Sequence, residues 1–133
     1  MPHSATLRGP FTVRMTPAPA DPYADGQQMG RMTLDKTYEG ALTATGTGQM
    51  LTGMGSVKGS AAYVAMERIT GTLEGRTGSF LIHHRGTMDR GAQALEIHVV
   101  PDSGTGELEG ITGRMQIEFE GKQHLYVFAY TLP

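Results

Sequence analysis

Hydrophobic and polar residues alternate along most of this chain with a period of two. In the stretch "FTVRM", for example, Phe11, Val13 and Met15 share one side of an extended strand. Such alternation is typical of β-strands, and no helical period extends beyond about two turns. The pattern predicts an all-β protein with eight strands, over residues 11–15, 32–38, 41–51, 63–70, 79–88, 94–100, 114–120 and 124–132.

Four Glu-Gly pairs interrupt the alternation, at residues 39–40, 74–75, 109–110 and 120–121. Glycine adopts the positive φ angles of tight turns, so each pair is predicted to form a hairpin tip. The proline-rich stretch 16–28 predicts a loop between the first two strands, because proline cannot donate a ladder hydrogen bond. Residues 1–133 are predicted to form a single β-barrel domain, since the length suits one core.

One glycine-rich stretch, "SGTGELEGITGRM" at residues 103–115, has closely spaced glycines like those of a phosphate-binding loop. Such a loop needs a helix behind it and a terminal Lys or Ser/Thr, whereas "RMQIEFE" is a predicted strand. The stretch also contains "GELEGITGRM" (106–115), which nearly repeats "GTLEGRTGSF" (71–80). It is therefore predicted to be a turn that an antiparallel sheet uses twice.

Charge and composition exclude several classes of function. The net charge is -2, from 11 basic and 13 acidic residues that are well mixed, so the basic surface of a nucleic-acid-binding protein is missing. No apolar run is long enough for a membrane span. Cysteine is absent, which excludes disulfides and cysteine-ligated metals. The first residues lack the apolar core of a signal peptide, so a cytoplasmic location is predicted.

The turn at residues 74–75 fixes which side chains share the barrel interior. If the turn has two residues, Leu73 faces Arg76, and Ala65 then faces His84. Glu67 and His84 lie diagonally across this strand pair, within reach of each other, on the face richer in small and aromatic residues. Alternate residues of a barrel strand point inward. Lys36 alternates in phase with Leu34 and Tyr38, so it points inward or else extends out of the barrel mouth.

These inward-facing polar residues are the candidate ligand-binding residues: Lys36, Tyr63, Glu67 and His84. Glu67 and His84 are also the candidate catalytic pair. Buried ionisable groups among apolar neighbours suit a ligand cavity with polar anchors or a general acid/base site. The alternative is a satisfied polar network that only holds the strands in register, with Tyr63 filling the core.

The remaining histidines indicate no metal site. His83 and His84 are adjacent in a strand and point to opposite faces, so they cannot share an ion. His83 and His98 are predicted to lie outside the barrel. His124 points inward or outward according to the length of the turn before it. No metal and no cofactor are therefore predicted.

The stretches "YVAMERITGTLEGRTGSFLIHHRGTMDRG" and "VVPDSGTGELEGITG", with "LDKTYEG", resemble a bacterial family known as domain of unknown function 3224. The resemblance covers nearly the whole chain and is most specific over residues 63–113. It implies a fold similar to the allene oxide cyclase barrel, a calycin-like architecture of eight antiparallel strands around a cavity. The glycine-rich stretch is also similar to one in dirigent proteins. No catalytic residue of the cyclases matches this chain by motif.

Three functions are compatible with these observations. The barrel is predicted to bind a small, largely apolar molecule, with Lys36, Glu67 and His84 as polar anchors. It is alternatively an isomerase or cyclase in which Glu67 is the base and His84 the proton donor. The third reading is a filled barrel that assembles into a homo-oligomer, and a homo-oligomer is predicted in any case. The sequence leaves open whether the protein is an enzyme.

Overall fold

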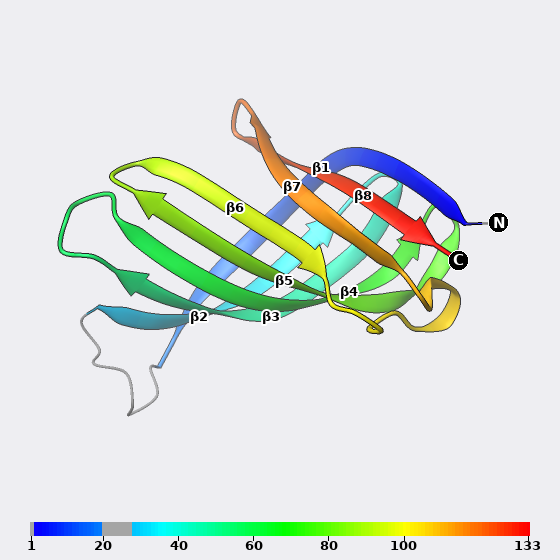
Figure 1. The fold of residues 1–133 in the computed structure, drawn as a ribbon, viewed down its shortest axis with the longest axis horizontal. Helices are drawn as coiled ribbons and strands as arrows, with labels where there is room; N and C mark the ends of the chain where they lie inside the picture. The colour runs from blue at the N-terminus through cyan, green and yellow to red at the C-terminus, as the bar shows by residue number, and fades with distance from the viewer. Residues whose placement is uncertain (1, 20–27) are drawn as a thin grey trace.

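The chain folds into a closed barrel of eight antiparallel strands in sequence order (Figure 1). The computed structural model describes residues 2–19 and 28–133. The strands are β1 (His3–Ala18), β2 (Met29–Tyr38), β3 (Leu42–Met54), β4 (Ala61–Leu73), β5 (Arg76–Asp89), β6 (Ala92–Val99), β7 (Thr112–Glu120) and β8 (Gln123–Leu132). Pairing of β1 with β8 closes the barrel. The predicted all-β class, the eight strands and the barrel are confirmed.

The β4–β5 hairpin has the predicted two-residue turn. Glu74 and Gly75 both adopt positive φ, 46° and 84°, which matches the twist of the strands they join. Leu73 consequently pairs with Arg76, and Ala65 pairs with His84. The register that places Glu67 and His84 on one face is therefore confirmed.

Two loop predictions differ from the structure. β1 continues to Ala18, so residues 16–18 belong to a strand, whereas residues 20–27 of the predicted loop lie outside the described residues. Glu109-Gly110 is not a hairpin tip, because it follows a short 3₁₀ helix, η1 (Gly106–Leu108), in the β6–β7 connection. The near-repeat at 71–80 and 106–115 thus adopts two different structures.

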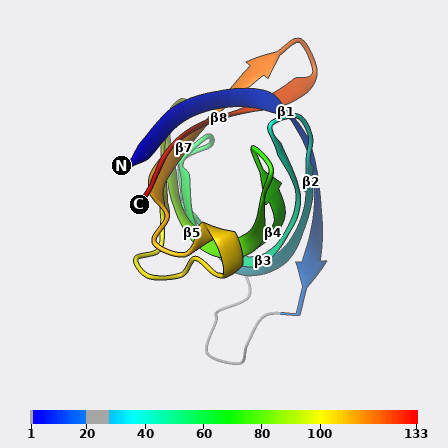
Figure 2. The same cartoon turned by 90° about the vertical axis from the view of Figure 1, so that its right-hand side faces the viewer.

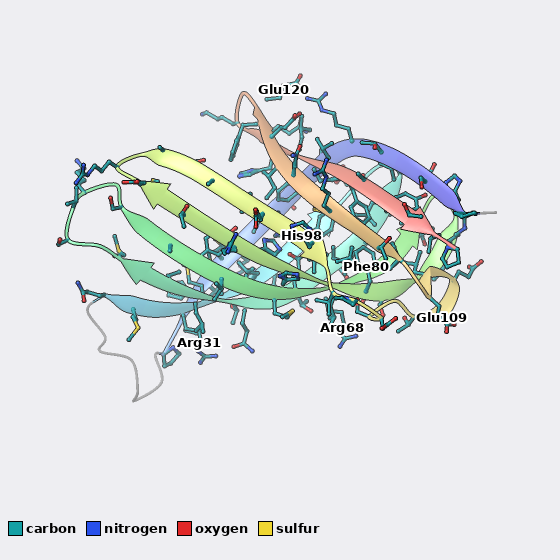
Figure 3. The ribbon with its side chains drawn as sticks, in the orientation of Figure 1. Arg31, Arg68, Phe80, His98, Glu109 and Glu120 are labelled. Carbon is teal, nitrogen blue, oxygen red and sulfur yellow. The ribbon has the colours of Figure 1, made fainter. Side chains whose placement is uncertain are left out.

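The end of the barrel that carries η1 faces the viewer in Figure 2. The half of the barrel at this end, which also carries the β4–β5 turn, is densely packed. The rings of Phe80 and Phe128 stack there with their centroids 5.6 Å apart (Phe80 is labelled in Figure 3). The loop around η1 covers this end, because Leu108 and Ile111 are each only 1% exposed. We call this half the packed half.

The opposite half is open. β6 and β7 share only two register pairs, at Ile97–Met115 and His98–Arg114, and the two strands then diverge (Figure 1). Inward-facing apolar side chains are exposed here on five strands: Met15 51%, Met54 63%, Met88 38%, Leu95 38% and Phe119 65%. An inward-facing side chain stays exposed only where nothing fills the space in front of it. We call this half the open half.

Candidate functional site

Three polar side chains converge on Glu67 at the boundary between the two halves. The Glu67 side chain is fully buried, and its Oε1 lies 2.8 Å from Nζ of Lys36 and 3.2 Å from Nε2 of His84. The Tyr38 hydroxyl donates a hydrogen bond to Oε2. The predicted residues Lys36, Glu67 and His84 are therefore brought together, and we call them, with Tyr38, the Glu67 cluster.

Lys36 and Glu67 are on strands that are not neighbours, and β3 lies between them. The inward-facing residues of β3 at this level are Gly46, which pairs with Lys36, and Gly48, which pairs with Glu67. Because neither has a side chain, Lys36 and Tyr38 reach over β3. A Cβ atom on Gly46 would overlap the Glu67 carboxylate. These two glycines create the space that the cluster occupies.

The neighbours of Glu67 keep it ionised although it is buried. Burial alone raises the pKa of Glu67, but the hydrogen bond from His84 and the charge and hydrogen bond of Lys36 outweigh it, so the pKa lies below its usual 4.5. Burial lowers the pKa of His84 from 6.5, against the hydrogen bond to Glu67. The pKa of Tyr38 is raised by burial and by the Glu67 charge. The cluster is thus a carboxylate, an ammonium and two neutral rings.

The second ring nitrogen of His84 is the one basic site left open in the cluster. An ionised carboxylate only accepts, so Nε2 of His84 carries the proton and Nδ1 has a free lone pair. Nδ1 makes no hydrogen bond to a described residue. Among those residues, no side-chain nitrogen or oxygen is both fully buried and unpaired, so Nδ1 keeps some exposed surface although the His84 side chain is only 3% exposed. Both oxygens of Glu67, by contrast, are already occupied.

The protein is expected to lose stability as the pH falls below about 6.5, because the unfolded chain then takes up a proton that folded His84 resists. Glu67 adds a second loss at lower pH, since its folded pKa is also depressed. The urea midpoint measured between about pH 7.5 and 5.5 tests this expectation. In that window His84→Gln is expected to flatten the profile, because the titrating group is gone.

His83→Gln provides the matched control for this pH profile. His83 is next to His84 in the chain but exposed on the outer face. Its charge is the smallest of the named effects on the pKa of His84, so its loss is expected to leave the wild-type slope nearly unchanged. Equal slopes in wild type and His84→Gln would show that His84 is not the group responsible.

Aromatic rings extend from the cluster towards the open half. Nζ of Lys36 lies 5.4 Å from the centre of the Phe11 ring, an attractive cation–π geometry. The His124 ring contacts Phe11 at 5.4 Å and Phe119 at 4.8 Å between centroids. Because Phe119 is exposed and Phe11 is buried, these rings form an aromatic wall that leads from solvent to the cluster.

The structure also shows the positions of Tyr63 and His124, two residues considered in the sequence analysis. Tyr63 is half-buried on the inner face, with its ring centre 6.4 Å from that of His84. Burial and the nearby charge of Glu67 raise the pKa of its hydroxyl. His124 pairs with Phe119 and not with Ile117, because the turn lies at residues 121–122. His124 nevertheless has the inward alternation, at the rim of the barrel.

Tyr38 is the site residue that sequence reasoning missed. It alternates in phase with Lys36, so its inward direction was visible in the pattern. Its contact with Glu67 depends on the pairing of three strands, which one hairpin does not reveal. His83 and His98 lie outside the barrel as predicted, and the described residues contain no group of three or more His, Cys, Asp or Glu suited to a metal ion.

The fold and the site define a class of protein: an antiparallel β-barrel with one half packed and a buried ionic cluster below an open half. The family described as "protein of unknown function (DUF3224)" matches residues 7–130, so the chain belongs to that family. A crystal structure of a DUF3224 protein of unknown function from Shewanella oneidensis MR-1 is similar, with 46% identity, 96% coverage of each chain and a TM-score of 0.90.

Neither the curated proteins nor a membrane-spanning helix adds information on the function. A search of curated proteins finds no match for this chain. In the described part of the chain, no helix has the length and apolar character needed to cross a membrane. The family therefore establishes the fold, and the function has to be argued from the site.

Proposed function

We propose that this barrel binds a small, largely apolar organic molecule in its open half, with the Glu67 cluster as the polar floor of the site. The observation that carries the proposal is the exposure of inward-facing apolar side chains on five strands above a buried charge cluster. Small-molecule sites combine apolar walls with a few fixed polar groups in this way. A barrel that served only as a filled scaffold would bury these side chains.

The cluster suits a ligand that carries one hydrogen-bond donor, such as a hydroxyl group. Each oxygen of Glu67 already has at least one partner, Lys36 and His84 at Oε1 and Tyr38 at Oε2. Nδ1 of His84 is the acceptor that has no partner among the described residues. In this proposal Lys36 neutralises the charge of Glu67, and Glu67 orients the His84 imidazole through the contact at Nε2. His84 then contacts the ligand. Tyr63 lies beside His84 on the inner face, where its ring lines the site and its hydroxyl adds a polar group.

The proposal predicts that a neutral, apolar fluorescent probe, N-phenyl-1-naphthylamine, binds the folded protein through the open half. Replacing inward-facing Leu95 with lysine places a charge in that half and is expected to weaken probe binding by about tenfold or more. Fluorescence titration gives the affinity of each variant. Native mass spectrometry of the purified protein checks in parallel for a small molecule that co-purifies.

Leu51→Lys is the matched control for this titration. Leu51 is also an exposed leucine on a strand, at 57%, but it points away from the barrel interior. Its substitution is expected to leave the probe affinity unchanged. If both lysine variants reduced binding equally, or if wild type bound no probe, the open half would not be the site.

Proton transfer on such a ligand is the second candidate, and the orientation of His84 favours it. Glu67 holds the Nε2 proton, which leaves Nδ1 as the base. This reverses the roles inferred from the sequence, in which Glu67 was the base and His84 the donor. An isomerase or cyclase activity would then be lost in His84→Gln while the probe still binds, which separates catalysis from binding.

The other predicted properties have no direct observation here. The likeness to allene oxide cyclase and dirigent barrels, the homo-oligomeric state and the cytoplasmic location stay predictions. Native mass spectrometry reports the number of subunits in the same experiment that detects a bound molecule.

A further inference from the structure

A second set of ligating side chains lies on the outer wall, apart from the Glu67 cluster. His83 of β5 and His98 of β6 pair directly across the two antiparallel strands (His98 is labelled in Figure 3). Both are exposed, and their ring centres are 5.9 Å apart with the planes inclined by 32°. Neither ring makes a hydrogen bond or an ion pair with a described residue. Their nitrogens are therefore free to bind a metal ion.

The spacing of the two rings suits one shared ion. An imidazole nitrogen binds a transition metal at about 2.0–2.1 Å, which places the ring centre about 3.2 Å from the metal. Two such rings have centres about 4.5 Å apart when the bonds are perpendicular and about 6.4 Å apart when they are opposite. The observed 5.9 Å falls inside this range, so only side-chain rotation is needed.

Met66 supplies a third donor from the neighbouring strand. It pairs directly with His83, its side chain is 50% exposed, and it lines the same outer hollow of about 650 Å³ as both histidines. A thioether is a soft ligand that favours copper, whereas imidazole accepts copper, zinc and nickel. We propose that His83 and His98, with Met66 as a weaker third ligand, bind a single copper ion on the outer wall of the barrel.

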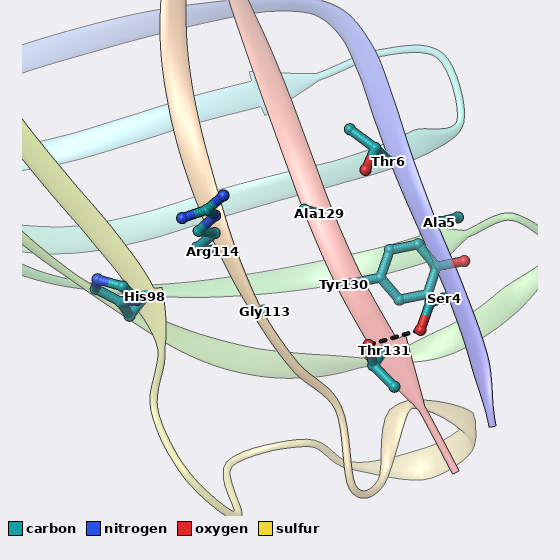
Figure 4. A pocket seen from close by; sticks show the side chains of 9 residues that line it. All are labelled: Ser4, Ala5, Thr6, His98, Gly113, Arg114, Ala129, Tyr130 and Thr131. Atoms are coloured by element: carbon teal, nitrogen blue, oxygen red, sulfur yellow. Dashed lines mark hydrogen bonds between the residues drawn. The ribbon is translucent and has the colours of Figure 1, made fainter.

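Neighbouring charges modulate this site. Arg85 and Glu96 form an ion pair at 2.7 Å beside the histidines, so their charges largely cancel. Arg114 of β7 pairs with His98 on the other side and lines a second, shallow hollow on the outer wall with it (Figure 4). Its positive charge opposes a cation at His98. Replacing Arg114 with glutamine is therefore expected to strengthen copper binding by a few-fold.

The test is copper titration of the full chain with His3→Gln in every variant, which removes an exposed imidazole outside the pair that could itself bind copper. Electron paramagnetic resonance follows Cu(II), and competition with bicinchoninate gives the Cu(I) affinity. We expect one copper per chain with two nitrogen ligands. His83→Gln and His98→Gln are each expected to weaken binding by at least about tenfold. Met66→Leu is expected to weaken Cu(I) more than Cu(II).

His124→Gln is the matched control, because it removes an imidazole that lies away from the pair. It is expected to leave copper affinity unchanged. All the substituted outer-wall side chains are exposed, so the thermal midpoint of the metal-free variants is expected to match that of the parent protein. Copper affinity that survives His83→Gln or His98→Gln, or that falls equally in His124→Gln, would overturn the proposal.

Discussion

Replacing Glu67 with leucine is expected to lower the free energy of unfolding by about 3–5 kcal/mol, although leucine is the more apolar residue. The reason is the partner that remains: Lys36 is only 7% exposed, and the substitution leaves its ammonium buried without a carboxylate. Tyr38 and His84 lose their acceptor at the same time. Urea denaturation monitored by circular dichroism measures the loss.

The double variant Glu67→Leu with Lys36→Met separates this effect from simple packing. Removing both charges leaves no buried ion without a partner, so most of the lost free energy of unfolding is expected to be recovered. A double variant as unstable as Glu67→Leu alone would contradict the argument from the buried charge. If the double variant is stable but no longer binds the apolar probe, the ion pair is retained for binding and not for folding.

A single added methyl group at Gly48 is expected to cost about 3 kcal/mol or more. A Cβ atom there would overlap the backbone carbonyl oxygen of Met66 and lie 2.9 Å from Cα of Glu67. Both are main-chain atoms of β4, so they cannot move without disturbing the β3–β4 pairing that holds Glu67 in place. Gly48→Ala is thus expected to lower both the urea midpoint and the affinity for the apolar probe.

Gly53→Ala is the control on the same strand. A Cβ atom at Gly53 meets no atom within 4 Å, so this substitution is expected to change stability by no more than about 0.5 kcal/mol. Similar losses in the two variants would show that alanine is disfavoured along β3 in general, and would remove the argument for a close approach at Gly48.

Local pattern was enough to predict the strands and one register. Alternation with period two identified the inner face, and Glu74-Gly75 joined β4 and β5 by a turn whose length sets every pair in that hairpin. Lys36 was placed inward for the same reason, since its alternation with Leu34 and Tyr38 needs no knowledge of other strands. These features are encoded within short stretches of chain.

Similar local sequences did not determine similar structures where tertiary contacts differ. "GTLEGRTGSF" forms a hairpin because the strands on either side of it pair with each other. "GELEGITGRM" follows β6, and its residues instead contact β5: the backbone N–H of Thr77 donates to Oε1 of Glu107 at 3.1 Å. With Leu108 buried in the end of the barrel, this segment forms η1 and not a hairpin tip.

The sequence by itself determined the all-β class, the inward face of β4 and β5, and the inward direction of Glu67 and His84, because these depend on alternation and turn length. For Lys36 the alternation indicated the inward side but did not exclude the barrel mouth. Only the tertiary structure decided that Lys36 and Tyr38 reach Glu67 across Gly46 and Gly48 of β3, and that β6 and β7 diverge to leave one half open. Those features depend on closure of the barrel, which brings together residues that are distant in the chain.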